Sequence, residues 1–62
     1  MKRATQLVSY DENMKPKTIR TLPDAAGKTF DEITKMVENL AQEDNAHFVE
    51  LRLVWVRDDY QF

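Results

Sequence analysis

The sequence contains no cysteine, a single glycine, a single histidine and two prolines. Without cysteine the chain can form neither disulfides nor a thiolate zinc site. The single glycine excludes a glycine-rich phosphate-binding loop: Gly27-Lys28-Thr29 matches only the end of that motif, and its first glycine position holds Leu22. Very small domains need extra stabilisation, and these absences leave oligomerisation as the available route.

Neither sign of charge dominates, because nine basic and eleven acidic residues give a net charge of −2. This balance does not favour nucleic acid or a membrane surface as the partner. No stretch approaches the roughly 20 apolar residues of a membrane span, so we expect a cytoplasmic protein without a membrane partner. The 62 residues allow one domain, covering 1–62. A domain of this size buries only about 60% of its unfolded surface and is marginally stable alone.

The segment 30–43 shows the pattern of an amphipathic helix. Thr29 and Glu32 have the spacing of a capping box, and Asn45 can take the left-handed conformation that ends a helix. The apolar positions recur at helical spacing and predict one buried stripe. They are Phe30, Ile33, Val37, Leu40 and Ala41.

The segment 47–57 is the clearest strand, because β-branched and aromatic residues alternate between two faces. Val49, Leu51, Leu53 and Trp55 form an apolar face that we expect to pack against the helix, with Trp55 as the main core anchor. The other face is mixed, and neighbouring Glu50 and Arg52 could pair on it. Its residues are Phe48, Glu50, Arg52, Val54 and Val56.

The N-terminal third reads as a hairpin of strands 3–10 and 17–22 around a polar loop, and Pro16 predicts that the second strand starts after it. The tail 58–62 is expected to fray, although Tyr60 and Phe62 could pack. The elements predict a small α+β fold, ordered strand–strand–helix–strand. A right-handed crossover places the strands in order 2-1-3, all antiparallel, with the helix on one face.

The last strand would then lie at a sheet edge, where its backbone groups are unpaired. We therefore expect a homodimer or another protein partner to bind there. The expected interface comprises the mixed face of that strand, namely Phe48, Glu50, Arg52, Val54 and Val56.

Catalytic residues are hard to assemble from this composition. Ser9 has no identifiable base, and His47 would need both a pocket and a carboxylate such as Asp44. Glu43, Asp44 and His47 follow no known metal-ligand spacing. We expect a protein that is not an enzyme and that holds no metal and no cofactor.

Basic residues on the hairpin support an alternative function. Lys15, Lys17 and Arg20 could form a short basic strip that binds nucleic acid beside Tyr10. The excess of acidic residues and the lack of a recognition helix disfavour it.

The outer helix face supports a second alternative, because Asp31, Glu32 and Glu38 could imitate spaced phosphates. The segments 37–40 (VENL) and 50–53 (ELRL) resemble the helix and last strand of small dimeric phage-encoded uracil-DNA glycosylase inhibitors, over about a third of the chain. That resemblance implies an exposed apolar side chain, typically aromatic, beside helix acids. Phe30 is the only aromatic residue of the helix, and its spacing predicts burial instead. Lys35 also interrupts the acidic face.

These observations favour a small non-enzymatic protein-interaction or regulatory module. Very small acidic proteins are often inhibitors or regulators, including those encoded by phages and mobile elements, and act by binding a host protein. The sequence does not identify the partner.

Overall fold

The computed structural model describes residues 1–62. Three strands, β1 (Lys2–Tyr10), β2 (Pro16–Pro23) and β3 (Phe48–Val56), form one sheet. A single turn of 3₁₀-helix, η1 (Ala25–Gly27), leads from β2 into the helix α1 (Phe30–Asp44). The prediction that this strand starts after Pro16 is wrong by one residue, because Pro16 is itself the first residue of β2, a position where its missing N–H is tolerated. The helix α1 lacks the length and apolar character needed to cross a membrane.

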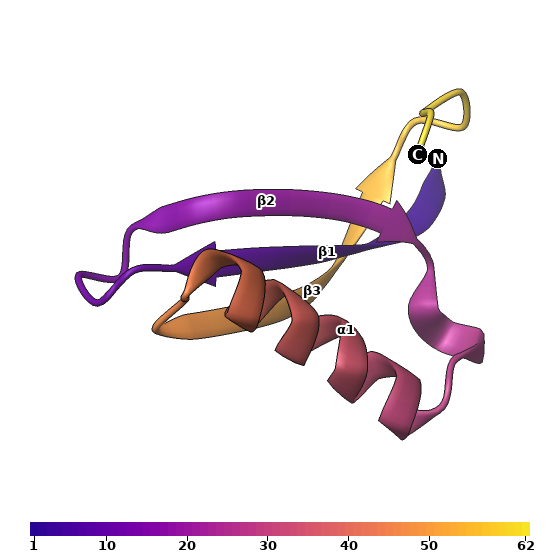
Figure 1. The fold of residues 1–62 in the computed structure, drawn as a ribbon. Helices are drawn as coiled ribbons and strands as arrows, with labels where there is room; N and C mark the ends of the chain where they lie inside the picture. Colours follow the sequence, from indigo (N-terminus) through magenta and orange to yellow (C-terminus); the bar gives the residue numbers. More distant parts are fainter.

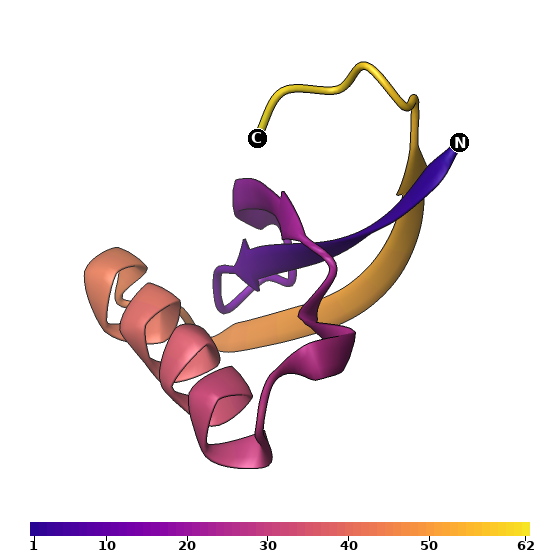
Figure 2. The same cartoon turned by 90° about the vertical axis from the view of Figure 1, so that its right-hand side faces the viewer.

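The strand order is β2-β1-β3, and both neighbouring pairs are antiparallel (Figure 1). This confirms the predicted α+β class and strand order. The crossover from β2 to β3 passes over β1, and α1 lies on one side of the sheet (Figure 2). As a result β1 is the central strand, whereas β2 and β3 are both edges.

Both predicted helix signals are present at the ends of α1. Thr29 Oγ1 accepts a hydrogen bond from the Glu32 backbone N–H, and Glu32 Oε1 accepts one from the Thr29 N–H. Asn45 is left-handed with φ 49°, and its N–H is directed at the Ala41 and Gln42 carbonyls. Both helix ends therefore satisfy backbone groups that would otherwise lack partners.

Pairing between the strands fixes which side chains share a face. Leu7 of β1 lies opposite Leu51 of β3 and opposite Arg20 of β2. Directly opposed residues of antiparallel strands point to the same side of the sheet. The odd-numbered residues of β3 therefore share the helix-covered face with Leu7, as predicted. The even-numbered residues of β1 and β3 lie on the opposite, open face.

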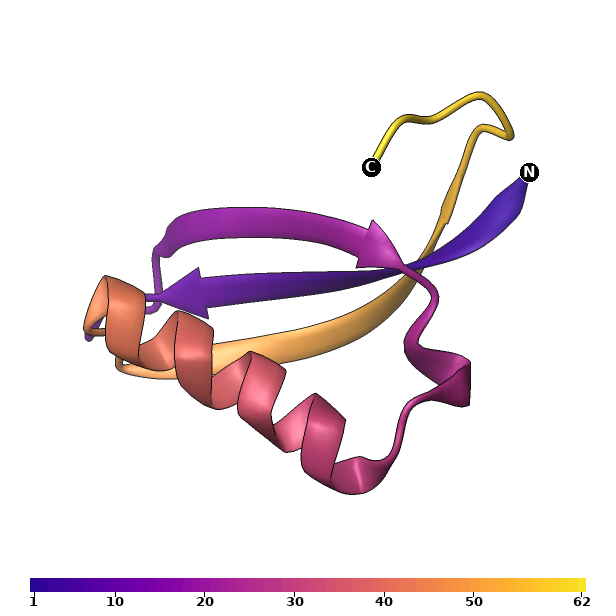
Figure 3. The same ribbon diagram turned by 45° about the vertical axis from the view of Figure 1, so that its right-hand side comes forward.

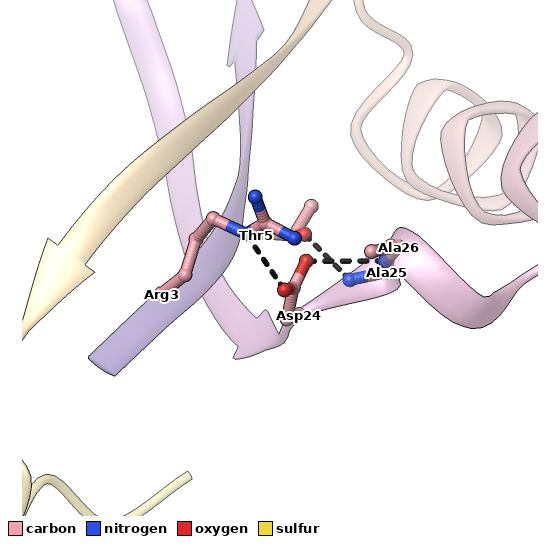
Figure 4. Close-up of polar contacts among 5 residues, drawn as sticks. All are labelled: Arg3, Thr5, Asp24, Ala25 and Ala26. Carbon is pink, nitrogen blue, oxygen red and sulfur yellow. Dashed lines mark hydrogen bonds and ion pairs between the residues drawn. The ribbon is translucent and has the colours of Figure 1, made fainter.

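A set of polar contacts ties the crossover to β1 (Figure 4). Thr5 is fully buried, and its Oγ1 accepts a hydrogen bond of 2.9 Å from the Ala25 N–H. Arg3 Nε donates to Asp24 Oδ2 at 2.7 Å, and Asp24 Oδ1 accepts from the Ala26 N–H at 3.1 Å. The hydrogen bond from Arg3 lowers the pKa of Asp24. Together these contacts fix where the chain leaves the sheet.

The core is small and centres on β1. Only seven residues are buried, and five of them belong to this strand. The buried set is Ala4, Thr5, Leu7, Val8, Ser9, Ala25 and Leu40. A compact monomer of 7.3 kDa should expose roughly 4,200 Å². This chain exposes 4583 Å², so part of its apolar surface has no cover within the chain.

Three residues predicted to lie in the core are largely exposed. Leu53, on the strand face expected to pack against the helix, is 61% exposed. Trp55, expected to anchor the core, is 65% exposed, and Phe30, expected in the buried helix stripe, is 82% exposed. The cause is the angle between α1 and β3. The C-terminal end of α1 lies along the start of β3, but its N-terminal end moves away while β3 curves towards the chain ends (Figure 3). The faces were assigned correctly, yet the helix reaches only part of the strand.

The tail 58–62 lies against the N-terminal end of the chain, and its two aromatic residues pack, as the sequence suggested. Lys2 Nζ donates to the Tyr60 carbonyl at 3.2 Å and lies 4.9 Å from the centre of the Phe62 ring. The Tyr60 and Phe62 rings pack edge to face with centres 5.2 Å apart, and the N-terminal amine pairs with Asp58 at 3.2 Å. Aromatic stacking and a cation–π contact therefore hold the two chain ends together.

Candidate interaction surface

Four of the large exposed apolar side chains lie on α1 and on the helix-covered face of β3. Besides Phe30 and Trp55, Leu53 is 61% exposed and Leu51 is 38% exposed. We call these four residues the α1–β3 apolar surface. The three β3 residues lie on the helix-covered face of that strand, and Phe30 is the first residue of α1, at the end of the helix that diverges from β3. Exposed apolar side chains concentrated in one region of a small protein indicate a contact surface.

The C-terminal end of α1, near the start of β3, is packed against the sheet. Leu40 is fully buried, and Ser9 Oγ donates to Asp44 Oδ2 at 2.5 Å. Arg20 Nη2 pairs with Glu43 Oε2 at 3.0 Å. The hydrogen bond from Ser9, followed by one from the Thr18 side chain, lowers the pKa of Asp44. The helix is therefore held firmly at one end only.

The five residues expected at the interface lie on the open face, where Phe48 is about half exposed. The Phe48 ring packs against the Tyr10 ring, with centres 5.6 Å apart. The Tyr10 hydroxyl donates to Glu50 Oε1 at 2.7 Å and accepts from Arg52 Nη2 at 3.2 Å. Val54 and Val56 are partly buried on the same face.

The predicted pairing of Glu50 with Arg52 is confirmed, with 3.1 Å between Oε1 and Nη2. The hydrogen bond that Tyr10 donates lowers the pKa of Glu50, and the hydrogen bond that Arg52 donates to the same hydroxyl raises the pKa of Arg52. Sequence reasoning missed Tyr10 as a member of this cluster. The strand register reveals it, because Tyr10 lies opposite Phe48.

The basic residues of the hairpin do not form an open strip. Lys17 Nζ donates to the Asp44 carbonyl, and Arg20 pairs with Glu43. Both side chains are thus directed at the acidic end of α1, while Lys15 lies apart in the exposed loop. The groups that could have bound phosphates are partly occupied by the protein's own helix.

The acidic residues Asp31, Glu32 and Glu38 are exposed on α1. Glu32 also serves the capping box, and its hydrogen bond from the Thr29 backbone lowers its pKa. Phe30 lies beside Asp31 and Glu32 in the chain and points into solvent. The exposed aromatic that the inhibitor resemblance implies is therefore present, although the helical spacing had predicted burial.

Of the residues considered for catalysis, Ser9 and Asp44 are hydrogen-bonded to each other. His47 is exposed, and its backbone N–H donates to the Tyr10 carbonyl at 2.9 Å. Asp44 binds buried Ser9 instead, and no three residues of the metal-binding types His, Cys, Asp and Glu cluster. The one surface hollow is lined by Leu22, Pro23, Asp24, Gly27, Lys28 and Met36. It contains neither His47 nor Ser9.

Comparisons with known proteins found no matching family model, no matching curated protein and no matching solved structure.

Proposed function

We propose that this protein is a small, non-enzymatic interaction module that acts in the cytoplasm by binding another protein. One observation carries the proposal. The chain keeps its largest apolar side chains outside a core built mainly from small residues. Exposing Trp55, Phe30 and Leu53 costs free energy in water, and contact with a partner recovers it.

The composition of this surface fits such a role. Aromatic residues are enriched at the energetic centres of protein interfaces, where a few side chains supply most of the affinity. Phe30 and Trp55 are of that type, and neither is needed to fill the core. The surrounding helix residues are charged, which gives the surface a polar rim.

The proposal is tested by capture experiments with matched variants. Immobilised wild-type protein, Trp55→Ser, Phe30→Ser and Ile19→Ser are exposed to the same lysate and washed at high salt. Ile19 is 60% exposed but lies on β2 and the open face, so it is the control for Trp55 at 65%. We expect a partner that is lost with Trp55→Ser and retained with Ile19→Ser. A partner bound equally by all four proteins would show that this surface is not the contact.

Phe30 favours a second candidate, inhibition of a DNA-processing enzyme by imitation of DNA. An exposed aromatic beside Asp31 and Glu32 combines an apolar anchor with negative charges, as a stretch of DNA does with a base and its phosphates. Titrating the protein into a uracil-excision assay tests it. Inhibition should be abolished by Phe30→Ala and retained by Ile19→Ala. An enzyme that works at its full rate at every inhibitor concentration would exclude this candidate.

A further inference from the structure

The outer edge of β3 is open to another strand. The strand pairs with β1 along all nine residues, and no strand lies on its other side. Its pairing with β1 has no bulge, and it contains no proline, so two common protections against edge pairing are missing. All four of its odd-numbered residues, Val49, Leu51, Leu53 and Trp55, are apolar, which makes the edge attractive to a second strand.

A second copy of this chain can pair there only in certain ways. Antiparallel pairing of β3 with β3 of the second copy places a two-fold axis perpendicular to the sheet. Directly opposed residues must then point to the same side, so odd positions face odd positions. Both helices lie on the same side of a continuous six-stranded sheet, and each possible register is centred on one residue that faces its own counterpart.

Charge selects among these registers. Centring on Glu50 or on Arg52 would place two like charges directly opposite each other, which destabilises a sheet. Centring on Leu51 instead places Glu50 opposite Arg52 of the second copy, twice by symmetry. Within one chain only Oε1 of Glu50 and Nη2 of Arg52 are engaged, so Oε2 and the remaining guanidinium donors are free for that pairing.

The same register covers exposed apolar residues. Leu51 faces Leu51 of the second copy, and Leu53 faces Val49, all on the helix-covered side. On the open side Phe48 faces Val54. A register centred on Leu53 would place Glu50 opposite Val56 and Arg52 opposite Val54, without a single charge pair.

We propose that a second copy of this chain binds the β3 edge in the register centred on Leu51, joined by two Glu50–Arg52 pairs. The inference deepens the proposed interaction function by naming one partner and its geometry. It leaves Phe30, which lies on neither strand, available to a different protein.

Single cysteines test the register, since the protein has none of its own. Leu51→Cys, Arg52→Cys and Leu53→Cys are oxidised under identical mild conditions and separated without reductant. Opposed positions in antiparallel strands lie close enough for a disulfide. We expect a covalent dimer with Leu51→Cys and little with the other two. Cross-linking strongest at Leu53 or Arg52 would overturn the register but keep the dimer.

Charge reversal tests the pairing itself, by sedimentation of the two variants alone and mixed. Glu50→Arg and Arg52→Glu each place like charges opposite each other, so each alone should self-associate at least about tenfold more weakly than wild type. Mixed together they become complementary at both positions and should form a heterodimer, although neither chain regains its internal pair. A mixture that stays monomeric would exclude this pairing. A wild-type protein that is monomeric at all concentrations would exclude the second copy, while capture of a partner through Trp55 would still support the proposed function.

Discussion

The two ends of α1 meet the sheet in different ways. At its C-terminal end Leu40 is fully buried, and hydrogen bonds from β1 and β2 reach Asp44. At its N-terminal end Phe30 is largely exposed, and Leu53 and Trp55 in the second half of β3 are exposed as well. Large apolar residues stand at both ends. At the C-terminal end these residues pack against the chain's own sheet, whereas at the N-terminal end nothing in the chain covers them. The first end therefore stabilises the fold, and the second is available to bind a partner.

The largest effect should come from the packed end. Leu40→Ala should lower the free energy of unfolding by about 2–5 kcal/mol, because it leaves a cavity under the helix. Leu53→Ala is the matched control and should cost less than about 1 kcal/mol in the monomer, since that side chain is mostly in water already. Urea unfolding at low protein concentration measures both.

Two further outcomes test whether the two ends of α1 differ in packing. If Leu40→Ala is too unstable to measure, Leu40→Met keeps the volume and should cost less than about 1.5 kcal/mol. If Leu53→Ala proves as costly as Leu40→Ala, the two ends are equally packed in solution and the division between them is wrong.

The crossover contact should give an intermediate effect. Thr5→Val keeps the shape of the side chain but removes the acceptor for the Ala25 N–H, leaving that donor buried and unpaired. We expect a loss of about 1–2 kcal/mol in urea unfolding. Thr21→Val is the control, because the hydroxyl of Thr21 pairs only with the partly exposed Gln6 side chain. Equal losses of stability in the two variants would show that the hydrogen bond from Ala25 to Thr5 stabilises the fold no more than the one between Gln6 and Thr21.

Sequence patterns predicted the fold well where the signals were local. The capping box at Thr29, the left-handed Asn45 and the alternation along β3 each depend on residues a few positions apart. The strand order followed from the handedness of the crossover. Even the pairing of Glu50 with Arg52 needed only their spacing on one strand face.

The exposure of Phe30 and Trp55 could not be predicted in this way. Periodicity assigns a residue to a face, but the cover over that face depends on the angle between helix and sheet. That angle is set by the twist of the strands and by contacts distant in sequence, such as Ser9 with Asp44. For the same reason Tyr10 was missed, because its place beside Glu50 appears only when β1 and β3 are in register.

Lowering the pH should destabilise the packed end of α1 through protonation of Asp44. This loss of stability should be the smallest of those predicted here. Its hydrogen bond from Ser9 holds the pKa of Asp44 below the ordinary value of 3.8 in the folded protein. The unfolded chain therefore takes up a proton at a higher pH than the folded chain does. The contribution of Asp44 is fully present above the unfolded value and is lost as pH falls through the lower folded value.

Asp44→Asn isolates this contribution. Urea midpoints measured from about pH 6 down to about pH 2 should fall less steeply in this variant than in wild type, although it starts from a lower stability. Asp31→Asn is the control, because Asp31 is an exposed carboxylate of the same helix. The remaining acid sensitivity of Asp44→Asn reports the other carboxyl groups whose pKa is lowered by hydrogen bonds, Asp24, Glu32 and Glu50. If Asp44→Asn and Asp31→Asn follow the same acid profile, the bond between Ser9 and Asp44 does not fasten the helix end, and the contrast between the two ends rests on Leu40 alone.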